Sequence, residues 1–232
     1  MGYTYLLFDA DNTLFDFDAA ERCAHAILCR KHGLAFSEEG YQLYRRCNAQ
    51  LWQDFDQGLC TKDFLLVERF RRYLALTGEE ADPEELNRDH LRALGENAVL
   101  LPGALELCQA LSPGHELYIL TNAVASVQRA RFTRSPLVPY FKDVFISETI
   151  GAGKPSMAYY DHVFQAIPGL TRDNCLVIGD SLSSDIQGAN NAGLPCCWFN
   201  PRGMPWPEGL RIDYEVRTLG EILPIVQKQD QA

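Results

Sequence analysis

The stretch LLFDADNTLF, residues 6–15, decides the fold that this sequence predicts. The apolar run from Tyr3 to Phe8 is short and rich in aromatic residues, which is typical of a buried β-strand. The run ends directly in two carboxylates, Asp9 and Asp11. Because open α/β sheets bind ligands beyond the carboxyl ends of their strands, we expect both aspartates at such an edge.

The two neighbouring aspartates call for a partner. At a separation of about 4 Å and an effective dielectric of about 20, two carboxylates repel by roughly 4 kcal/mol. A cation or a shared proton would relieve that repulsion. Taken alone, the stretch also fits an acidic loop or a helix cap.

The composition is that of a globular protein with an acidic surface. The 232 residues are 47% hydrophobic and 22% charged, and the formal net charge is −10. This length accommodates one domain, or a core domain with an insertion. Such a surface repels a phosphate backbone, so we expect no nucleic-acid polymer as a partner.

No segment reads as a membrane span or a signal peptide. No apolar run approaches the roughly 20 residues that a membrane span needs, and no basic leader precedes Asp9. We therefore expect a cytoplasmic protein without a membrane partner. The eight cysteines form no CxxC pair and the five histidines have no metal-ligand spacing, so free thiols are expected and a zinc site is not.

Residues 16–95 carry the signals of successive helices and of no strand. Apolar residues recur at helical spacing between Phe64 and Leu74. The expected caps precede helices at 19–31, 38–55, 62–77 and from 83 onward, and they are Asp18, Ser37, Thr61 and Asp82.

From Leu101 onward, expected helices alternate with expected strands. The strands are expected at 116–120, 144–147, 175–178, 195–199 and 214–216, with helices at 103–111, 123–134, 156–166, 184–192 and 219–227. This alternation predicts parallel strands joined by crossover helices. The predicted fold is therefore α/β, with a Rossmann-like parallel sheet core formed by residues 1–15 and 96–232 and an all-helical cap inserted at 16–95.

Polar residues follow later strands in the same way as they follow the first. Thr121 and Asn122 follow the second strand, Asp180 follows a later one with Asp185 five residues beyond, and Lys154 lies in a glycine-rich loop. Because these strand ends share one edge of a parallel sheet, they are expected beside the two aspartates of the first strand. Such a set of oxygen donors suits Mg²⁺. Singly, each residue could instead be a helix cap or a solvated charge.

These segments resemble the four motifs of the haloacid dehalogenase superfamily of phosphatases. FDADNTL at 8–14 is similar to DxDxT[LV], and the later motifs are matched at 120–122, 154–155 and 179–186. The resemblance covers nearly the whole chain, and 16–95 corresponds to the family's small helical cap. More narrowly, segments 8–11, 51–58 and 146–151 resemble the bacterial pyrimidine 5′-nucleotidase branch, which hydrolyses nucleoside monophosphates, including non-standard ones.

The resemblance implies a two-step mechanism. Asp9 would attack phosphorus and form an aspartyl-phosphate, while Asp11 would act first as general acid and then as general base. The dehalogenases of the family lack the second aspartate, so its presence favours phosphoryl transfer.

The resemblance also implies the surroundings of that phosphate. Mg²⁺ would be held by the carboxylates of Asp9 and Asp180 and by the carbonyl oxygen of Asp11. Asp185 would orient Lys154 or a metal-bound water. The groups expected to bind or neutralise the phosphate are Thr121, Asn122 and Lys154.

Substrate choice would come from aromatic residues in or near the cap. Phe15, Trp52 and Phe55 could stack on a base, or simply pack between helices. The expected substrate is thus a small phosphomonoester, with nucleoside 5′-monophosphates first. Two alternatives stay open: a phosphatase or mutase for another phosphometabolite, such as a sugar phosphate or phosphoglycolate, and a non-catalytic binding module. The second would be favoured by loss of Asp9 or Asp11, and both are present.

Overall fold

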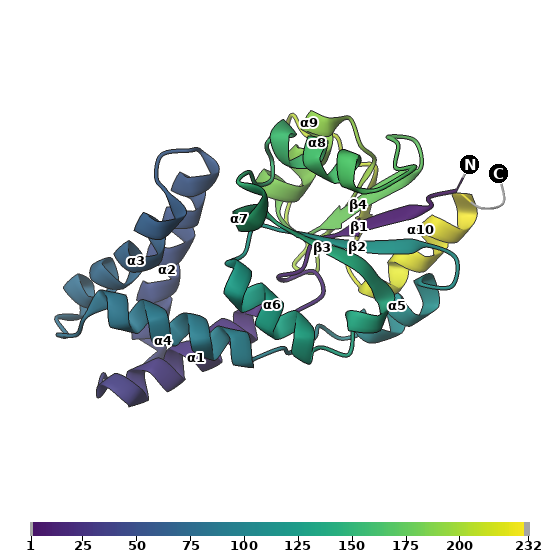
Figure 1. The fold of residues 1–232 in the computed structure, drawn as a ribbon. Coiled ribbons are helices and arrows are strands. Elements are labelled where there is room, and N and C mark those ends of the chain that lie inside the picture. The colour runs from purple at the N-terminus through teal and green to yellow at the C-terminus, as the bar shows by residue number, and fades with distance from the viewer. Residues whose placement is uncertain (1, 230–232) are drawn as a thin grey trace. The chain divides into compact units, whose positions relative to one another are not determined.

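The structure, a computed structural model, describes residues 2–229, which divide into two compact units (Figure 1). The first unit comprises the described parts of Met1–Phe17 and Val99–Ala232, and the second is Asp18–Ala98. The division lies within three residues of the expected one. Within residues 2–229, no helix combines the length and the apolar character that a membrane span requires.

A parallel sheet forms the centre of the first unit. Among the described residues, six strands pair in the order β3-β2-β1-β4-β5-β6. Their bounds are β1 (Tyr5–Phe8), β2 (Glu116–Thr121), β3 (Phe141–Ile146), β4 (Cys175–Gly179), β5 (Cys196–Phe199) and β6 (Tyr214–Val216). The predicted α/β, Rossmann-like fold is confirmed.

The register places the ends of three strands within two residues of one another. β1 lies between β2 and β4, and Phe8 is aligned with Ile119 on one side and with Ile178 on the other. The residues that follow these strands therefore emerge side by side at one edge of the sheet.

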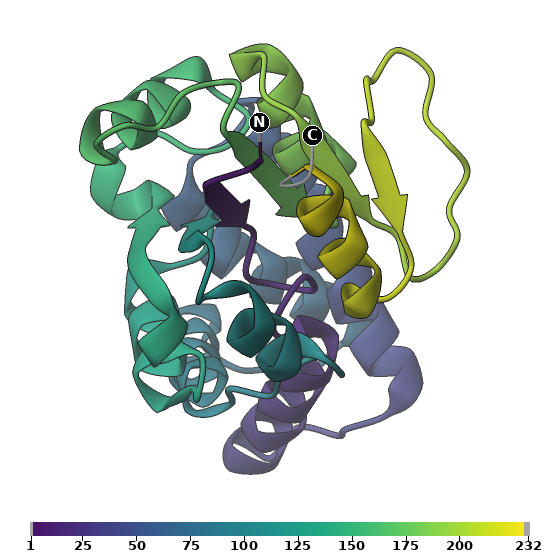
Figure 2. The ribbon, with the colours of Figure 1, turned by 90° about the vertical axis from the view of Figure 1, so that its right-hand side faces the viewer.

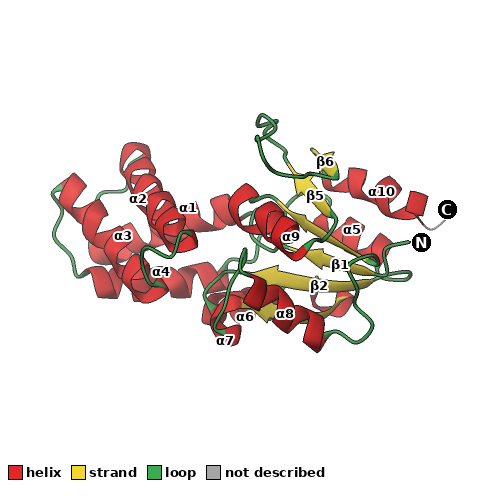
Figure 3. Ribbon diagram, turned by 90° about the horizontal axis from the view of Figure 1, so that it is seen from above, coloured by secondary structure: helices red, strands yellow, loops and turns green. Residues whose placement is uncertain are grey.

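Helices cover both faces of the sheet. α8 (Met157–Ala166) and α9 (Gln187–Ala192) lie over one face, while α5 (Ala104–Leu111) and α10 (Ile222–Gln229) lie over the other (Figures 1 and 3). α5 and α10 are far apart in the sequence but side by side in space, as Figure 2 shows for the teal and yellow helices. α6 (Ala125–Arg134) follows β2.

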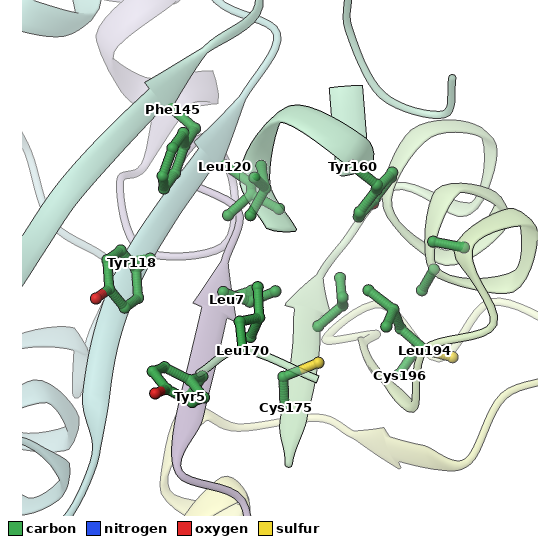
Figure 4. Packing of buried hydrophobic residues seen from close by; sticks show 14 of the residues in the cluster. Tyr5, Leu7, Tyr118, Leu120, Phe145, Tyr160, Leu170, Cys175, Leu194 and Cys196 are labelled. Carbon is green, nitrogen blue, oxygen red and sulfur yellow. The ribbon is translucent and has the colours of Figure 1, made fainter. Parts of the chain in front are cut away.

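The core explains why the first strand is apolar throughout. Figure 4 shows Leu7 and Leu120 on the side of the sheet where Tyr160 of α8 lies, and these side chains belong to one buried cluster. The alternate residue Phe8 is also buried, and its ring meets that of Phe141 edge to face at 6.2 Å. A central strand of a parallel sheet is covered on both faces, so its residues need not alternate in polarity.

Two local details near the sheet differ from the prediction. The sequence predicted a strand through Ser147, but the chain turns there into the short helix α7 (Ser147–Ile150). The predicted helix at 184–192 is a turn of π-helix at Leu182–Ile186 followed by α9. Four or five residues are too few for a 3.6-residue periodicity to be recognised.

The second unit consists of α1 (Phe17–His32), whose first residue lies in the other unit, α2 (Glu38–Asp56), α3 (Lys62–Thr77) and α4 (Pro83–Glu96). Three predicted caps are confirmed: Ser37, Thr61 and Asp82 accept hydrogen bonds from backbone N–H groups two or three residues later. The predicted cap Asp18 is wrong because α1 begins one residue earlier. Its carboxylate accepts a hydrogen bond from Arg45 at 3.2 Å.

The interior of this helical unit contains a buried carboxyl group. Glu21 is 3% exposed, and its Oε1 accepts hydrogen bonds from Asn48 at 2.8 Å and from Tyr44 at 3.4 Å. Burial raises the pKa of Glu21 to about 7, although the nearby charge of Arg69 acts in the opposite direction.

Glu21→Gln is expected to flatten the pH dependence of stability. Because the folded-state pKa lies above the ordinary value of 4.5, the contribution of Glu21 is present below that value and is lost as the pH rises through about 7. Between pH 5 and pH 8, the wild type should lose about 2–3 kcal/mol of unfolding free energy relative to the variant. Urea titrations at both pH values measure this, with the exposed Glu39→Gln as control. Parallel pH profiles for wild type and Glu21→Gln would contradict the assignment.

Candidate active site

The central strands deliver acidic side chains to one edge of the sheet. Asp9 follows β1 directly, and its N–H donates to the carbonyl oxygen of Ile178 at 2.8 Å, so it is still held against β4. Asp180 follows β4, and Thr121 is the last residue of β2. This adjacency is the one that the parallel order of the strands predicted.

Lys154 connects the acidic residues. Its Nζ donates to Asp9 Oδ1 at 2.7 Å, to Asp185 Oδ1 at 2.6 Å and to the carbonyl oxygen of Leu120 at 2.7 Å. The residue is 4% exposed, which excludes a solvated loop charge. Burial alone would lower the pKa of Lys154, but the carboxylates of Asp185 and Asp9 raise it well above its ordinary value. The ammonium group is therefore a fixed positive charge.

Three carboxyl groups lie close enough to share a cation. Among the described residues, oxygens of Asp9, Asp180 and Asp185 all lie within 4.8 Å of one another. Burial raises the pKa of Asp180 well above its ordinary value, and the charges of Asp9 and Asp185 raise it further. Burial likewise raises the pKa of Asp185 to about 6, although Lys154 opposes it. One ammonium does not balance this set, and its hard oxygen donors fit a divalent cation.

Asp185 is fixed by the protein itself. Its Oδ1 accepts from Lys154, and its Oδ2 accepts from the N–H of Ser181 at 3.0 Å. It packs over Gly179, where an added Cβ would lie 2.6 Å from the Cβ of Asp185. Only glycine leaves room for this carboxylate. Asp9 and Asp180 are therefore the carboxylates better placed to hold a cation.

The side chain of Asn122 connects the end of β2 to the loop that contains Lys154. Its Oδ1 accepts from the N–H of Lys154 at 2.9 Å, and its Nδ2 donates to the carbonyl oxygen of Lys154 at 2.8 Å. Its side chain thus fixes the loop and is not a helix cap. The Oγ1 of Thr121 accepts from the N–H of Ala123 at 3.2 Å.

Two supporting residues were not found from the sequence. The hydroxyl of Tyr159 accepts from the N–H of Thr121 at 3.1 Å and donates to the carbonyl oxygen of Phe145 at 2.7 Å. Trp198 Nε1 donates to the carbonyl oxygen of Asp180 at 3.0 Å. Their aromatic character signalled only core packing, and nothing local in the sequence reveals these partners.

Asp11 lies in a tight turn and has a cationic partner. Asn12 adopts φ 61°, and its N–H donates to the carbonyl oxygen of Phe15 at 2.8 Å. The carboxylate Oδ1 of Asp11 accepts a hydrogen bond from Nη1 of Arg131, which sequence reasoning also missed. The side chain of Asp11 is 23% exposed. The surrounding protein raises the pKa of this carboxyl, while Arg131 lowers it.

The aromatic residues expected to bind a base have different surroundings. Phe15 is fully buried, with the guanidinium of Arg131 4.7 Å from its ring centroid. A base cannot stack on a ring without exposed surface, so Phe15 supports Arg131 and the substrate contact expected for it is wrong. Trp52 and Phe55 on α2 are half-buried and meet edge to face at 5.7 Å, with Lys62 Nζ 5.9 and 5.5 Å from their centroids.

Comparisons with known proteins identify a family and several relatives. The profile of the haloacid dehalogenase-like hydrolase family matches residues 3–193. The HAD-hydrolase YfnB of Bacillus subtilis is 38% identical over 224 residues, which is 97% of this chain and 95% of that protein. Its magnesium-bound crystal structure matches with a TM-score of 0.94 over 97% of this chain and 99% of that one.

Two further relatives have an assigned substrate class. The pyrimidine 5′-nucleotidase PynA of Streptococcus pneumoniae is 37% identical over 229 residues, covering 98% of this chain and 97% of that protein. The pyrimidine 5′-nucleotidase YjjG of Escherichia coli is 32% identical over 228 residues, covering 98% of this chain and all of that protein.

Proposed function

Since the chain belongs to the haloacid dehalogenase-like hydrolases, we propose that it is a Mg²⁺-dependent phosphatase of nucleoside 5′-monophosphates, with a preference for pyrimidine nucleotides. That it hydrolyses phosphoric monoesters follows from the family and from the nucleotidase relatives. The observation that carries the proposed chemistry is the ammonium of Lys154 between Asp9 and Asp185, with Asp180 alongside. The nucleotide preference is supported by PynA and YjjG.

The reaction takes two steps. A carboxylate oxygen of Asp9 attacks phosphorus, the bond from phosphorus to the nucleoside oxygen breaks, and Asp11 donates its proton to that oxygen. Water then attacks phosphorus of the aspartyl-phosphate, Asp11 takes a proton from it, and Asp9 is released with inorganic phosphate. Asp11 must therefore be protonated when the first step begins and ionised when the second step begins.

The remaining residues stabilise the charge on phosphorus. Lys154 offsets the negative charge of the phosphate, and Asp185 keeps it in place. Thr121 and the N–H of Asn122 donate to phosphate oxygens. Mg²⁺ held by Asp9, Asp180 and the carbonyl oxygen of Asp11 would screen the nucleophile from the anion that it approaches.

A panel of phosphomonoesters tests the substrate class. UMP, dUMP and dTMP are assayed for released phosphate beside sugar phosphates and phosphoglycolate, before and after treatment with EDTA. The proposal expects the pyrimidine nucleotides to have the highest kcat/KM, loss of activity with EDTA and recovery with added Mg²⁺. A sugar phosphate or phosphoglycolate as the best substrate would replace the nucleotidase assignment, and activity that resists EDTA would contradict the metal requirement.

Trp52→Ala is expected to weaken the binding of nucleotides selectively. We propose that the half-buried Trp52 and Phe55 stack on the base, so the variant should raise KM for UMP at least about fivefold. KM for p-nitrophenyl phosphate, which has no base, should stay unchanged. Phe64→Ala removes an exposed ring of the same helical unit and serves as control. An equal effect of Trp52→Ala on both substrates would indicate a packing role.

A further inference from the structure

We propose that Arg131 is a positioning residue that fixes the carboxyl group of Asp11 for proton transfer. The inference rests on the proposed mechanism and assigns a residue to it that lies outside the four motifs. Arg131 belongs to α6, which begins three residues after Asn122 (Figure 1). The segment with Thr121 and Asn122, which is proposed to bind the phosphate, therefore leads directly into the helix whose Arg131 binds Asp11.

The guanidinium of Arg131 is enclosed by protein. Its side chain has no exposed surface, and it lies 4.7 Å from the ring centroid of Phe15 and 5.8 Å from that of Phe17. Gln128, three residues earlier on α6, accepts from Nη1 at 3.4 Å. The planar group is thus fixed by two rings and its own helix before it meets Asp11.

A buried guanidinium restrains the carboxylate that it binds. Arginine stays charged at all pH values of interest, and a buried charge is costly without an anionic partner. The ionised carboxylate of Asp11 meets this requirement through Oδ1, and when Asp11 is protonated on Oδ2 its Oδ1 can still accept the same hydrogen bond. Rotating Asp11 away would separate the pair, so Arg131 restricts the carboxyl group to one orientation.

The turn that contains Asp11 helps to position both Asp11 and the guanidinium of Arg131. The N–H groups of Leu14 and Phe15 both donate to the carbonyl oxygen of Ala10 at 2.9 Å, which closes the turn around Asp11. One short turn therefore supplies the carboxylate that binds Arg131 and the ring of Phe15 on which it lies. With Oδ1 on Arg131, Oδ2 is the oxygen that exchanges the proton with the leaving group and later with water.

Substrates with different leaving groups test the proposal. The nucleoside oxygen of UMP needs a proton as it leaves, whereas p-nitrophenolate does not. Arg131→Gln should lower kcat/KM for UMP at least about 100-fold, within the range of general acid catalysis, and kcat/KM for p-nitrophenyl phosphate less than about fivefold. With p-nitrophenyl phosphate, kcat and KM should fall together, because hydrolysis of the aspartyl-phosphate still needs Asp11 as base.

Two further variants separate positioning from structure. Arg131→Lys keeps the charge and should recover part of the UMP activity, and Arg129→Gln, an exposed arginine of the same helix, should behave as wild type. Equal losses of kcat/KM on both substrates, or no loss on either, would overturn the proposal.

A double-mutant cycle gives an independent answer. If Arg131 acts through Asp11, then Arg131→Gln in an Asp11→Asn background should lower kcat/KM for UMP less than about twofold further. If Arg131→Gln lowered kcat/KM by the same factor in the Asp11→Asn background as in the wild type, the proposal would be overturned. If the wild-type enzyme hydrolysed p-nitrophenyl phosphate but not UMP, only the nucleotide assignment would be refuted. The effect of Arg131→Gln would then be measured with the best alkyl phosphate of the panel in place of UMP.

Discussion

Asp9→Asn is expected to lower kcat by roughly 10⁵-fold or more on every phosphomonoester, because an amide cannot replace the carboxylate as nucleophile. The amide oxygen can still accept the hydrogen bond that Lys154 donates to Oδ1, so the fold should be retained. Phosphate release measures the loss of turnover, and circular dichroism checks the fold. Mass spectrometry of acid-quenched wild type should show an added phosphoryl group that the variant lacks.

The matched control is Asp161→Asn, which removes an exposed carboxylate of α8 in the same unit. It should retain wild-type kcat. A folded Asp9→Asn enzyme with near-wild-type turnover would exclude Asp9 as the nucleophile, whatever the substrate.

Lys154→Met is expected to affect stability and activity together. Removing the ammonium leaves Asp9 and Asp185 buried without their shared cation, which costs about 3–5 kcal/mol of unfolding free energy. The same change removes a donor on which the phosphate depends, so kcat/KM should fall by about 10²–10³ or more. Urea unfolding and steady-state kinetics measure the two effects.

Lys142→Met, an exposed lysine on β3, is the control for loss of one positive charge. It should leave both quantities unchanged. A Lys154→Met protein as stable as wild type would contradict the view that this ammonium balances two buried carboxylates.

The sequence was sufficient for the sheet edge because the information there is local. Asp9 and Asp180 directly follow short apolar strands and Thr121 ends another, and parallel strands bring such positions together whatever the details of packing. Asp9, Thr121 and Asp180 could therefore be placed beside one another from the sequence alone. The helix caps Ser37 and Thr61 were predictable for the same reason.

Pairings across long distances in the sequence could not be predicted. Arg131 meets Asp11 across 120 positions, and Tyr159 meets Thr121 across 38. An arginine on an amphipathic helix ordinarily lies at the surface, so nothing in its neighbours indicates burial against a phenylalanine ring. Phe15 was misread for a related reason, since a sequence shows that a ring is near a motif but not which side of it is covered.

The central position of β1 has a consequence for biosynthesis. β1, which Asp9 follows directly, is translated before both of its neighbours, because β2 and β4 are complete only at Thr121 and Gly179. The intervening helices α2–α4 are built from contacts between successive segments, and topologies of that kind form quickly. In a nascent chain these helices would thus form while β1 is still unpaired, because the strands that flank β1 are translated later.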